Sequence, residues 1–191
     1  MILVAIPQHD KKRYCIEPLL DWIRDANLPD TEVLMRFHRG VYGETNAVKI
    51  QREFFRKFAL EYNATHFLLV GADTIPPLDV LERFLAHNVD VVGGVYYNRF
   101  ENGKAIAWRN GDTEFNKKEN IEKLKGLQVV DGMGMDCVLF SRKAFESVSF
   151  FDWEVNDDDY PYYDRLKEKG FTIYLDPTVV CKHYMDKETY A

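Results

Sequence analysis

The chain has 191 residues and a formal charge of −6, with 46% hydrophobic and 29% charged residues. These proportions are typical of a globular domain and argue against a disordered chain. Acidic residues outnumber basic ones by 31 to 25 without any long basic run, so nucleic acid is a poor partner. No apolar run of about 18 residues predicts a transmembrane anchor, and no basic segment of a signal peptide precedes the first strand. We therefore expect a soluble, cytoplasmic protein.

The first half of the chain alternates strand and helix patterns. Apolar runs predict strands at residues 2–6, 32–37, 66–70 and 90–94. Amphipathic spacing predicts helices at residues 17–26 and 45–62, the second capped by Thr45, and a short helix opened by Pro76 and Pro77 that runs through Leu85. This alternation predicts a doubly wound, mostly parallel α/β sheet flanked by helices.

The alternation of strand and helix patterns ends after Tyr97. Residues 98–127 are polar and indicate an insertion, with a short strand at 105–108 and a surface helix at 117–125. Strand patterns follow at residues 128–131, 137–140, 171–175 and 178–183, and helix patterns at 142–147 and 162–169. We expect a single domain over residues 1–191, with a smaller, mixed or antiparallel second half at 98–191.

The three cysteines, Cys15, Cys137 and Cys181, are odd in number and far apart, and no C-x-x-C pair is present. This usage predicts reduced thiols rather than a disulfide framework or a zinc site.

Asp73 directly follows a buried strand and precedes Pro76 and Pro77. In an open α/β sheet, ligands bind beyond the carboxyl ends of the strands, so a rigid element delivers this carboxylate to the place where a ligand sits. The position suits a metal ligand. A turn or helix-capping role explains the same residue equally well.

Two further groups carry chemistry near the end of the chain. Asp157, Asp158 and Asp159 precede a predicted helix, where a carboxylate could act as a general base or simply cap the helix N-terminus. Cys181 and His183 are two residues apart on a predicted strand and therefore share a face. His183 could be a metal ligand or a structural histidine.

The segment from Gly132 to Asp136 lacks the third glycine of a dinucleotide-binding fingerprint and precedes a strand. We expect a flexible loop whose backbone approaches a ligand. The sequence contains no P-loop and no Gly-x-Ser-x-Gly motif, which removes the main support for kinase-like and hydrolase functions.

In chain order, these segments resemble the GT-A glycosyltransferases, in particular the inverting family 2 type, over nearly the whole chain. The matching segments are residues 3–7, 45–47, 64–70 with Asp73 and Pro77, 92–96, 134–142, 158–159, and 176–177 before His183.

The resemblance implies a divalent cation, Mn²⁺ or Mg²⁺, held against the diphosphate of a nucleotide-sugar donor by an Asp-x-Asp motif. Here the motif reads Gly71-Ala72-Asp73, so its first aspartate is missing and its second is kept. The resemblance also implies that His183 is a metal ligand and that the catalytic base lies at Asp158 or Asp159, with Asp159 as first choice. Carboxylate and imidazole ligands suit Mn²⁺.

The resemblance divides the chain into a nucleotide-sugar-binding half, residues 1–97, and an acceptor-side half, residues 98–191. The implied donor-binding residues are Pro7, Gln8, Asp10, Arg39, Asn46, Ala72 and Asp73, and the acceptor-side residues are Gly132, Gly134 and Trp153. Tyr96, Tyr97, Trp108 and Trp153 are aromatic candidates for stacking on sugar rings, although aromatic side chains more often pack in the core.

The implied reaction is the transfer of a sugar from a nucleotide-diphosphate sugar to a hydroxyl of a glycan, lipid or protein, with inversion. A non-catalytic nucleotide-sugar-binding module of the same fold is the main alternative, because the first motif aspartate is missing. A nucleotidyltransferase is expected to carry a glycine-rich, basic loop directly after the first strand. The segment from Pro7 to Lys11 has no glycine, so this alternative is less well supported.

Overall fold

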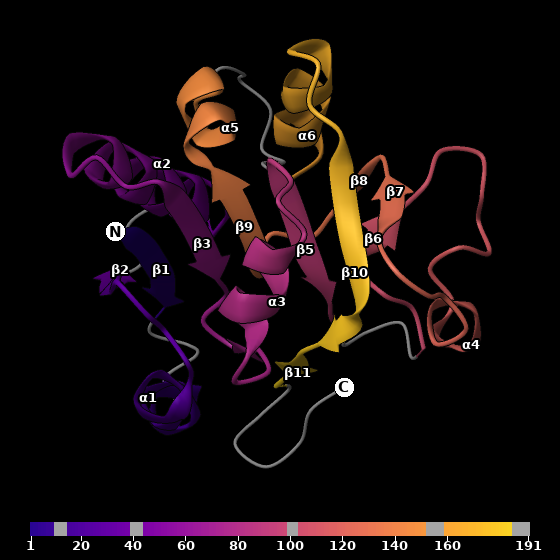
Figure 1. Ribbon diagram of the computed structural model, residues 1–191, viewed down its shortest axis with the longest axis horizontal. Helices are drawn as coiled ribbons and strands as arrows, with labels where there is room; N and C mark the ends of the chain where they lie inside the picture. Colours follow the sequence, from indigo (N-terminus) through magenta and orange to yellow (C-terminus); the bar gives the residue numbers. More distant parts are fainter. Residues whose placement is uncertain (10–14, 39–43, 99–102, 152–158, 185–191) are drawn as a thin grey trace.

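The computed structural model describes residues 1–9, 15–38, 44–98, 103–151 and 159–184 (Figure 1). Its centre is a seven-stranded sheet in the order β2-β1-β3-β9-β5-β10-β7. The strands span β1 (Ile2–His9), β2 (Thr31–His38), β3 (His66–Val70), β5 (Val91–Val95), β7 (Gln128–Val130), β9 (Cys137–Ser141) and β10 (Ile173–Val180).

Most strands of this sheet run in one direction. β1 is parallel to β2 and β3, and β10 is parallel to β5. β9 lies between β3 and β5 and is antiparallel to both, while β7 is antiparallel to β10 at the edge. The predicted α/β class with a mostly parallel sheet is confirmed. The reversed strand sits in the middle of the sheet, although the sequence placed it in a separate second half.

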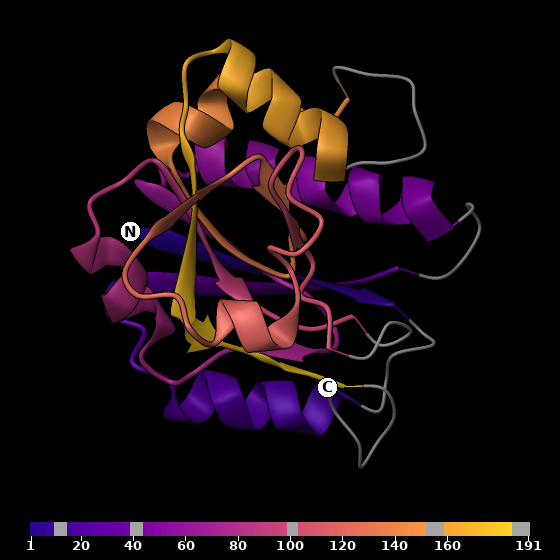
Figure 2. The same ribbon diagram turned by 90° about the vertical axis from the view of Figure 1, so that its right-hand side faces the viewer.

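Helices cover both faces of the sheet (Figure 2). One face carries α1 (Ile16–Asp25) and α3 (Val80–Ala86), which bury Leu19, Trp22 and Phe84 against the sheet. The other face carries α2 (Glu44–Glu61), α5 (Arg142–Ser147) and α6 (Asp159–Glu168). Two apolar cores result, one on each side, as expected for strands with continuous apolar runs. No helix in the described part of the chain is both long and apolar enough to cross a bilayer.

Two small sheets lie beside the main one. β4 (Thr74–Ile75) pairs with β11 (Lys182–His183), and β6 (Ala107–Trp108) pairs with β8 (Gly132–Met133). The first connects the segment after β3 with the end of the described chain. The second connects the insertion, which also contains α4 (Lys118–Ile121), with the segment before β9.

Several predicted boundaries differ from those in the structure. The helix expected to open at Pro76 and Pro77 begins at Val80, after the short strand β4 at residues 74–75, which pairs with β11. The helix assigned a Thr45 cap already begins at Glu44, and the helix expected over residues 117–125 is the single turn α4. The strands expected at 171–175 and 178–183 are one strand, β10, followed by β11.

The expected loop at residues 132–136 is mostly ordered against the core. Gly132 and Met133 form β8, and both are buried. The structure matches the expectation of reduced cysteines, since Cys15, Cys137 and Cys181 are all buried and none of them forms a disulfide.

A buried ion pair attaches α2 to the segment after α5. Glu53, with 2% of its side chain exposed, accepts two hydrogen bonds from Arg56 at 2.8 Å and one from the backbone N–H of Phe150 at 2.9 Å. Burial alone would raise the pKa of Glu53, but Arg56 and the hydrogen bonds from Phe150 and Ser149 together lower it. The charged form of Glu53 is therefore the one that stabilises the fold.

We predict that Glu53→Gln lowers the free energy of unfolding at pH 7 by about 3 kcal/mol, because it leaves the buried Arg56 without its counter-ion. A group with a lowered folded-state pKa contributes stability above its unfolded value, here 4.5, and that stability disappears as pH falls through the folded pKa. Urea unfolding between pH 7 and pH 3 should therefore show a smaller acid-induced loss in the variant. Glu146→Gln, which removes an exposed partner of Arg142, is the matched control and should cost under about 1 kcal/mol.

Candidate metal centre

A turn after β3 positions Asp73. The backbone N–H of Thr74 donates to the carbonyl of Gly71 at 3.3 Å, which closes a four-residue turn with Asp73 at its third position. The backbone N–H of Tyr184 then donates to the Asp73 carbonyl at 2.8 Å, so β11 holds the turn from the other side. The Asp73 side chain is fully buried. The turn expected from sequence is present, and it directs a carboxylate into the protein rather than into solvent.

His183 reaches the same place from β11. Its Nε2 lies 3.6 Å from Oδ2 of Asp73, and its side chain is 3% exposed. Its Nδ1 lies 2.8 Å from the carbonyl oxygen of Tyr97. Because a carbonyl only accepts, Nδ1 carries the proton, which in the neutral ring leaves the lone pair on Nε2, facing Asp73. This is the arrangement by which proteins orient a metal-binding histidine.

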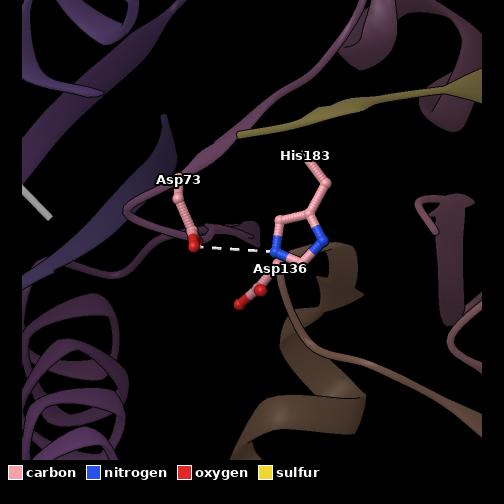
Figure 3. A group of neighbouring side chains, drawn as sticks. All are labelled: Asp73, Asp136 and His183. Carbon is pink, nitrogen blue, oxygen red and sulfur yellow. Dashed lines mark ion pairs between the residues drawn. The ribbon is translucent and has the colours of Figure 1, made fainter. Parts of the chain in front are cut away.

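Asp136 completes a group of three (Figure 3). One ligand atom from each of Asp73, Asp136 and His183 lies within 4.8 Å of the others. Asp136 comes from the segment between β8 and β9, so the three residues belong to three separate parts of the chain. Sequence reasoning missed Asp136, which it treated only as the end of a glycine-containing loop. Its place directly before an apolar strand was the one available signal.

Tyr96 packs behind the group. Its hydroxyl accepts a hydrogen bond from the backbone N–H of Asp136 at 3.3 Å, and its ring meets the His183 ring edge-on at 5.1 Å. Burial raises the pKa of Tyr96 well above its usual value, and the charges of Asp136 and Asp159 raise it further. Gly134 makes this contact possible, because a Cβ there would lie 2.6 Å from Cζ of Tyr96.

Arg52 links this group to Asp159. From α2, its buried side chain donates to Oδ1 of Asp159 at 2.6 Å and lies 3.7 Å from Oδ1 of Asp136. Asp159 is the first residue of α6, where a carboxylate interacts favourably with the helix dipole. The predicted base and the candidate metal ligands are therefore neighbours through one guanidinium. Arg52 was not identified from the sequence, because an arginine on an amphipathic helix usually faces solvent.

The structure describes only some of the residues that were expected to bind the nucleotide-sugar donor. Pro7 and Gln8 are buried near the end of β1, and Ala72 is buried in the turn beside Asp73. Both amide atoms of Gln8 are buried without a hydrogen-bond partner among the described residues. The side chain of Asn46 and the whole of Asp10 and Arg39 lie outside the described part of the chain. These donor-binding roles stay predictions.

The acceptor side is also placed in part. Tyr96 and Tyr97 are buried, so the suggestion that they offer open faces to a sugar is wrong. Trp108 instead stacks on Tyr160, which is 42% exposed, with ring centroids 5.1 Å apart. Gly132 gives Trp108 room, since a Cβ there would lie 2.6 Å from its Cε2. Gly132 therefore approaches Trp108 of the protein itself rather than a ligand. Asp158 and Trp153 lie outside the described residues.

The three side chains of this group are suitable ligands for a divalent cation. Two carboxylates and one imidazole with a fixed tautomer match the preference of Mn²⁺ for oxygen and nitrogen ligands, and also admit Mg²⁺. His183 Nε2 is buried and accepts no hydrogen bond from a described residue. Such an atom is costly to bury unless something binds it. The three residues could therefore hold a metal ion while leaving positions for other ligands.

No family model and no curated protein matches the chain, but solved structures do. A197 from STIV superposes with a TM-score of 0.71 at 19% identity, covering 99% of this chain and 88% of that one. The mannosyltransferase PcManGT from Pyrobaculum calidifontis, solved with GDP-Man and Mn²⁺, gives 0.59 at 18% identity, and S. aureus TarS 1-349 gives 0.52 at 13%.

The chain has the GT-A fold. The matches to PcManGT and TarS each cover 99% of this chain, but only 58% and 59%, respectively, of those two proteins. In this GT-A fold, the candidate metal group lies beyond the carboxyl ends of β3 and β5, the general location for ligands in open α/β sheets.

We predict that Arg52→Met lowers the free energy of unfolding by about 1.5–3 kcal/mol, the usual loss for hydrogen bonds to charged groups. Arg52→Lys should recover only part of this loss, because an ammonium lacks the planar fork that reaches two carboxylates. Urea unfolding measures both. Arg165→Met is the matched control, since its exposed pair with Glu168 should contribute under about 1 kcal/mol. Equal losses at positions 52 and 165 would contradict the bridging role of Arg52.

Proposed function

We propose that the chain is a metal-dependent glycosyltransferase that moves a sugar from a nucleotide-diphosphate sugar to an acceptor hydroxyl, with inversion. The observation that carries the proposal is the group of Asp73, Asp136 and His183, placed at the ligand-binding edge of a GT-A fold. PcManGT, which has this fold, was solved with GDP-Man and Mn²⁺. Mn²⁺ also suits the two carboxylates and the imidazole of the group found here.

In the proposed reaction, Asp159 takes the proton from the acceptor hydroxyl as that oxygen attacks C1 of the donor sugar. The bond between C1 and the phosphate oxygen breaks, and the nucleoside diphosphate leaves with the electron pair. Attack from the side opposite the leaving group inverts C1. A bound divalent cation would offset the negative charge that develops on the diphosphate.

The remaining residues act by position. Asp73, Asp136 and His183 form the metal-binding edge, and the Nδ1–H of His183 is held by the Tyr97 carbonyl. Arg52 holds Asp159 beside Asp136, which keeps the base close to the donor. On the acceptor side, we assign a contact with the acceptor sugar to the stack of the partly buried Trp108 on the exposed Tyr160, the residue next to Asp159.

We predict that nucleotide-diphosphate sugars raise the thermal midpoint only when Mn²⁺ is present, since binding to the native state stabilises it by RT ln(1 + [L]/Kd), about 2.7 kcal/mol at 100 times Kd. UDP-, GDP- and dTDP-linked sugars should be compared by thermal denaturation. A CMP-linked sugar, which lacks a diphosphate, is the ligand control.

Asp73→Ala should abolish this stabilisation. Asp90→Ala is the matched control, because Asp90 lies at the opposite end of the sheet, hydrogen-bonded to Ser141. A rise that is independent of metal, or that survives in Asp73→Ala, would remove the support for a metal-held donor.

We predict that Asp159→Asn lowers kcat by about 10²- to 10⁴-fold while donor affinity changes little, the usual contribution of general-base catalysis. Product formation from the nucleotide sugar that raises the thermal midpoint measures kcat. The thermal midpoint with that sugar and Mn²⁺ measures binding. Unchanged turnover would move the base to another residue, with Asp158 next to be tested. Donor binding without any transfer by the wild type would instead favour the non-catalytic nucleotide-sugar-binding module.

A further inference from the structure

Gly71 and Asp136 face each other across two antiparallel strands. The register of β3 and β9 pairs Val70 with Cys137, and it continues by one step because the backbone N–H of Gly71 donates to the carbonyl of Asp136 at 2.9 Å. Directly opposed residues on antiparallel strands project from the same face of the sheet. Side chains at positions 71 and 136 would therefore point into the same space.

That space has room for one side chain. A Cβ on Gly71 would lie 2.6 Å from both Cβ and Oδ1 of Asp136, closer than non-bonded carbon atoms approach each other in proteins. The carboxyl group of Asp136 thus fills the volume that a side chain at position 71 would need. Gly71 is required here by this close approach and not by its backbone conformation, since it is absent from the glycines with positive φ.

We propose that positions 71 and 136 are alternative sources of one metal-binding carboxylate, and that in this chain Asp136 supplies it. The inference rests on the proposed function, because it assigns a ligand of the same metal site. It explains why the motif reads Gly71-Ala72-Asp73 although the resemblance implies an aspartate at its first position. In this chain the acidic group beside position 71 comes from the neighbouring strand.

One observation supports a ligand at this point, and a second shows that the backbone of Asp136 is fixed. His183 Nε2 is buried, accepts no hydrogen bond from a described residue, and lies within 4.8 Å of a ligand atom of Asp136. The backbone of Asp136 is also held on both sides, its carbonyl by Gly71 and its N–H by the Tyr96 hydroxyl. These bonds fix the backbone from which the carboxylate projects, and Gly71 leaves that carboxylate the space beside it.

The test is an exchange of the carboxylate between the two strands. Mn²⁺ alone is titrated into the wild type, Asp136→Gly, Gly71→Asp and the double variant Gly71→Asp/Asp136→Gly, and free Mn²⁺ is measured by electron paramagnetic resonance. Thermal midpoints without metal report folding. Gly71→Asn/Asp136→Gly is the matched control, because it restores the side-chain volume without the charge.

Asp136→Gly should weaken Mn²⁺ binding by about 10- to 100-fold, at least the effect of losing a supporting group around a metal. The double variant should regain most of that affinity, and the asparagine control should not. Gly71→Asp alone should lower the thermal midpoint through overpacking, and the second substitution should restore it. Asp136→Asn, which keeps the shape of the side chain, gives the same measurement of lost affinity in case Asp136→Gly does not fold.

The proposal is overturned if the wild type binds no Mn²⁺, if Asp136→Asn binds it as tightly as the wild type, or if the double variant binds it no better than the asparagine control. These outcomes are separate from the failure of the proposed function. Exchange of Mn²⁺ affinity without sugar transfer by the wild type would leave the carboxylate exchange standing and remove only the transferase activity.

Discussion

The insertion of β9 between β3 and β5 is the constraint on which the site depends. This strand runs against both neighbours, so the residue before its start lies beside the residue after the end of β3. Had β9 been parallel, its carboxyl end would have met that edge, and Asp136 would lie at the opposite end of the sheet. The antiparallel pairing therefore brings Asp136 to Asp73, and β11 then adds His183 from the end of the described chain.

Helix α2 serves both the core and the site. Glu53 and Arg56 form a buried pair, and Arg52, next to Glu53 in sequence, points to Asp136 and Asp159. Buried charges are stable only when paired and hydrogen-bonded, so their geometry is narrowly defined. The helix thereby fixes the distance between the carboxylate before β9 and the first residue of α6, which are far apart in sequence. The chemistry proposed for Asp159 depends on that fixed distance.

Much of the fold could be predicted from the sequence, because apolar runs such as residues 66–70 and amphipathic spacing such as that of α2 are local signals. Asp73 and His183 were found for the same reason, since each follows or ends a strand. Asp136 and Arg52 could not be found, because their roles arise from strand direction and helix packing, which join distant segments. The helix predicted from Pro76 begins only at Val80, after the pairing of residues 74–75 with β11, a contact that the local sequence does not show.

The three candidate ligands also have a consequence for how the molecule is held together. They belong to the turn after β3, the segment before β9 and the two-stranded sheet of β4 and β11. An ion bound to all three would close two long loops of the chain, much as a cross-link does, and only after the sheet has formed. The short β4–β11 pair has just two residues on each strand and depends most on that closure. Metal would thus hold the last described strand of the chain in place, and order at this edge of the protein would follow the supply of the ion.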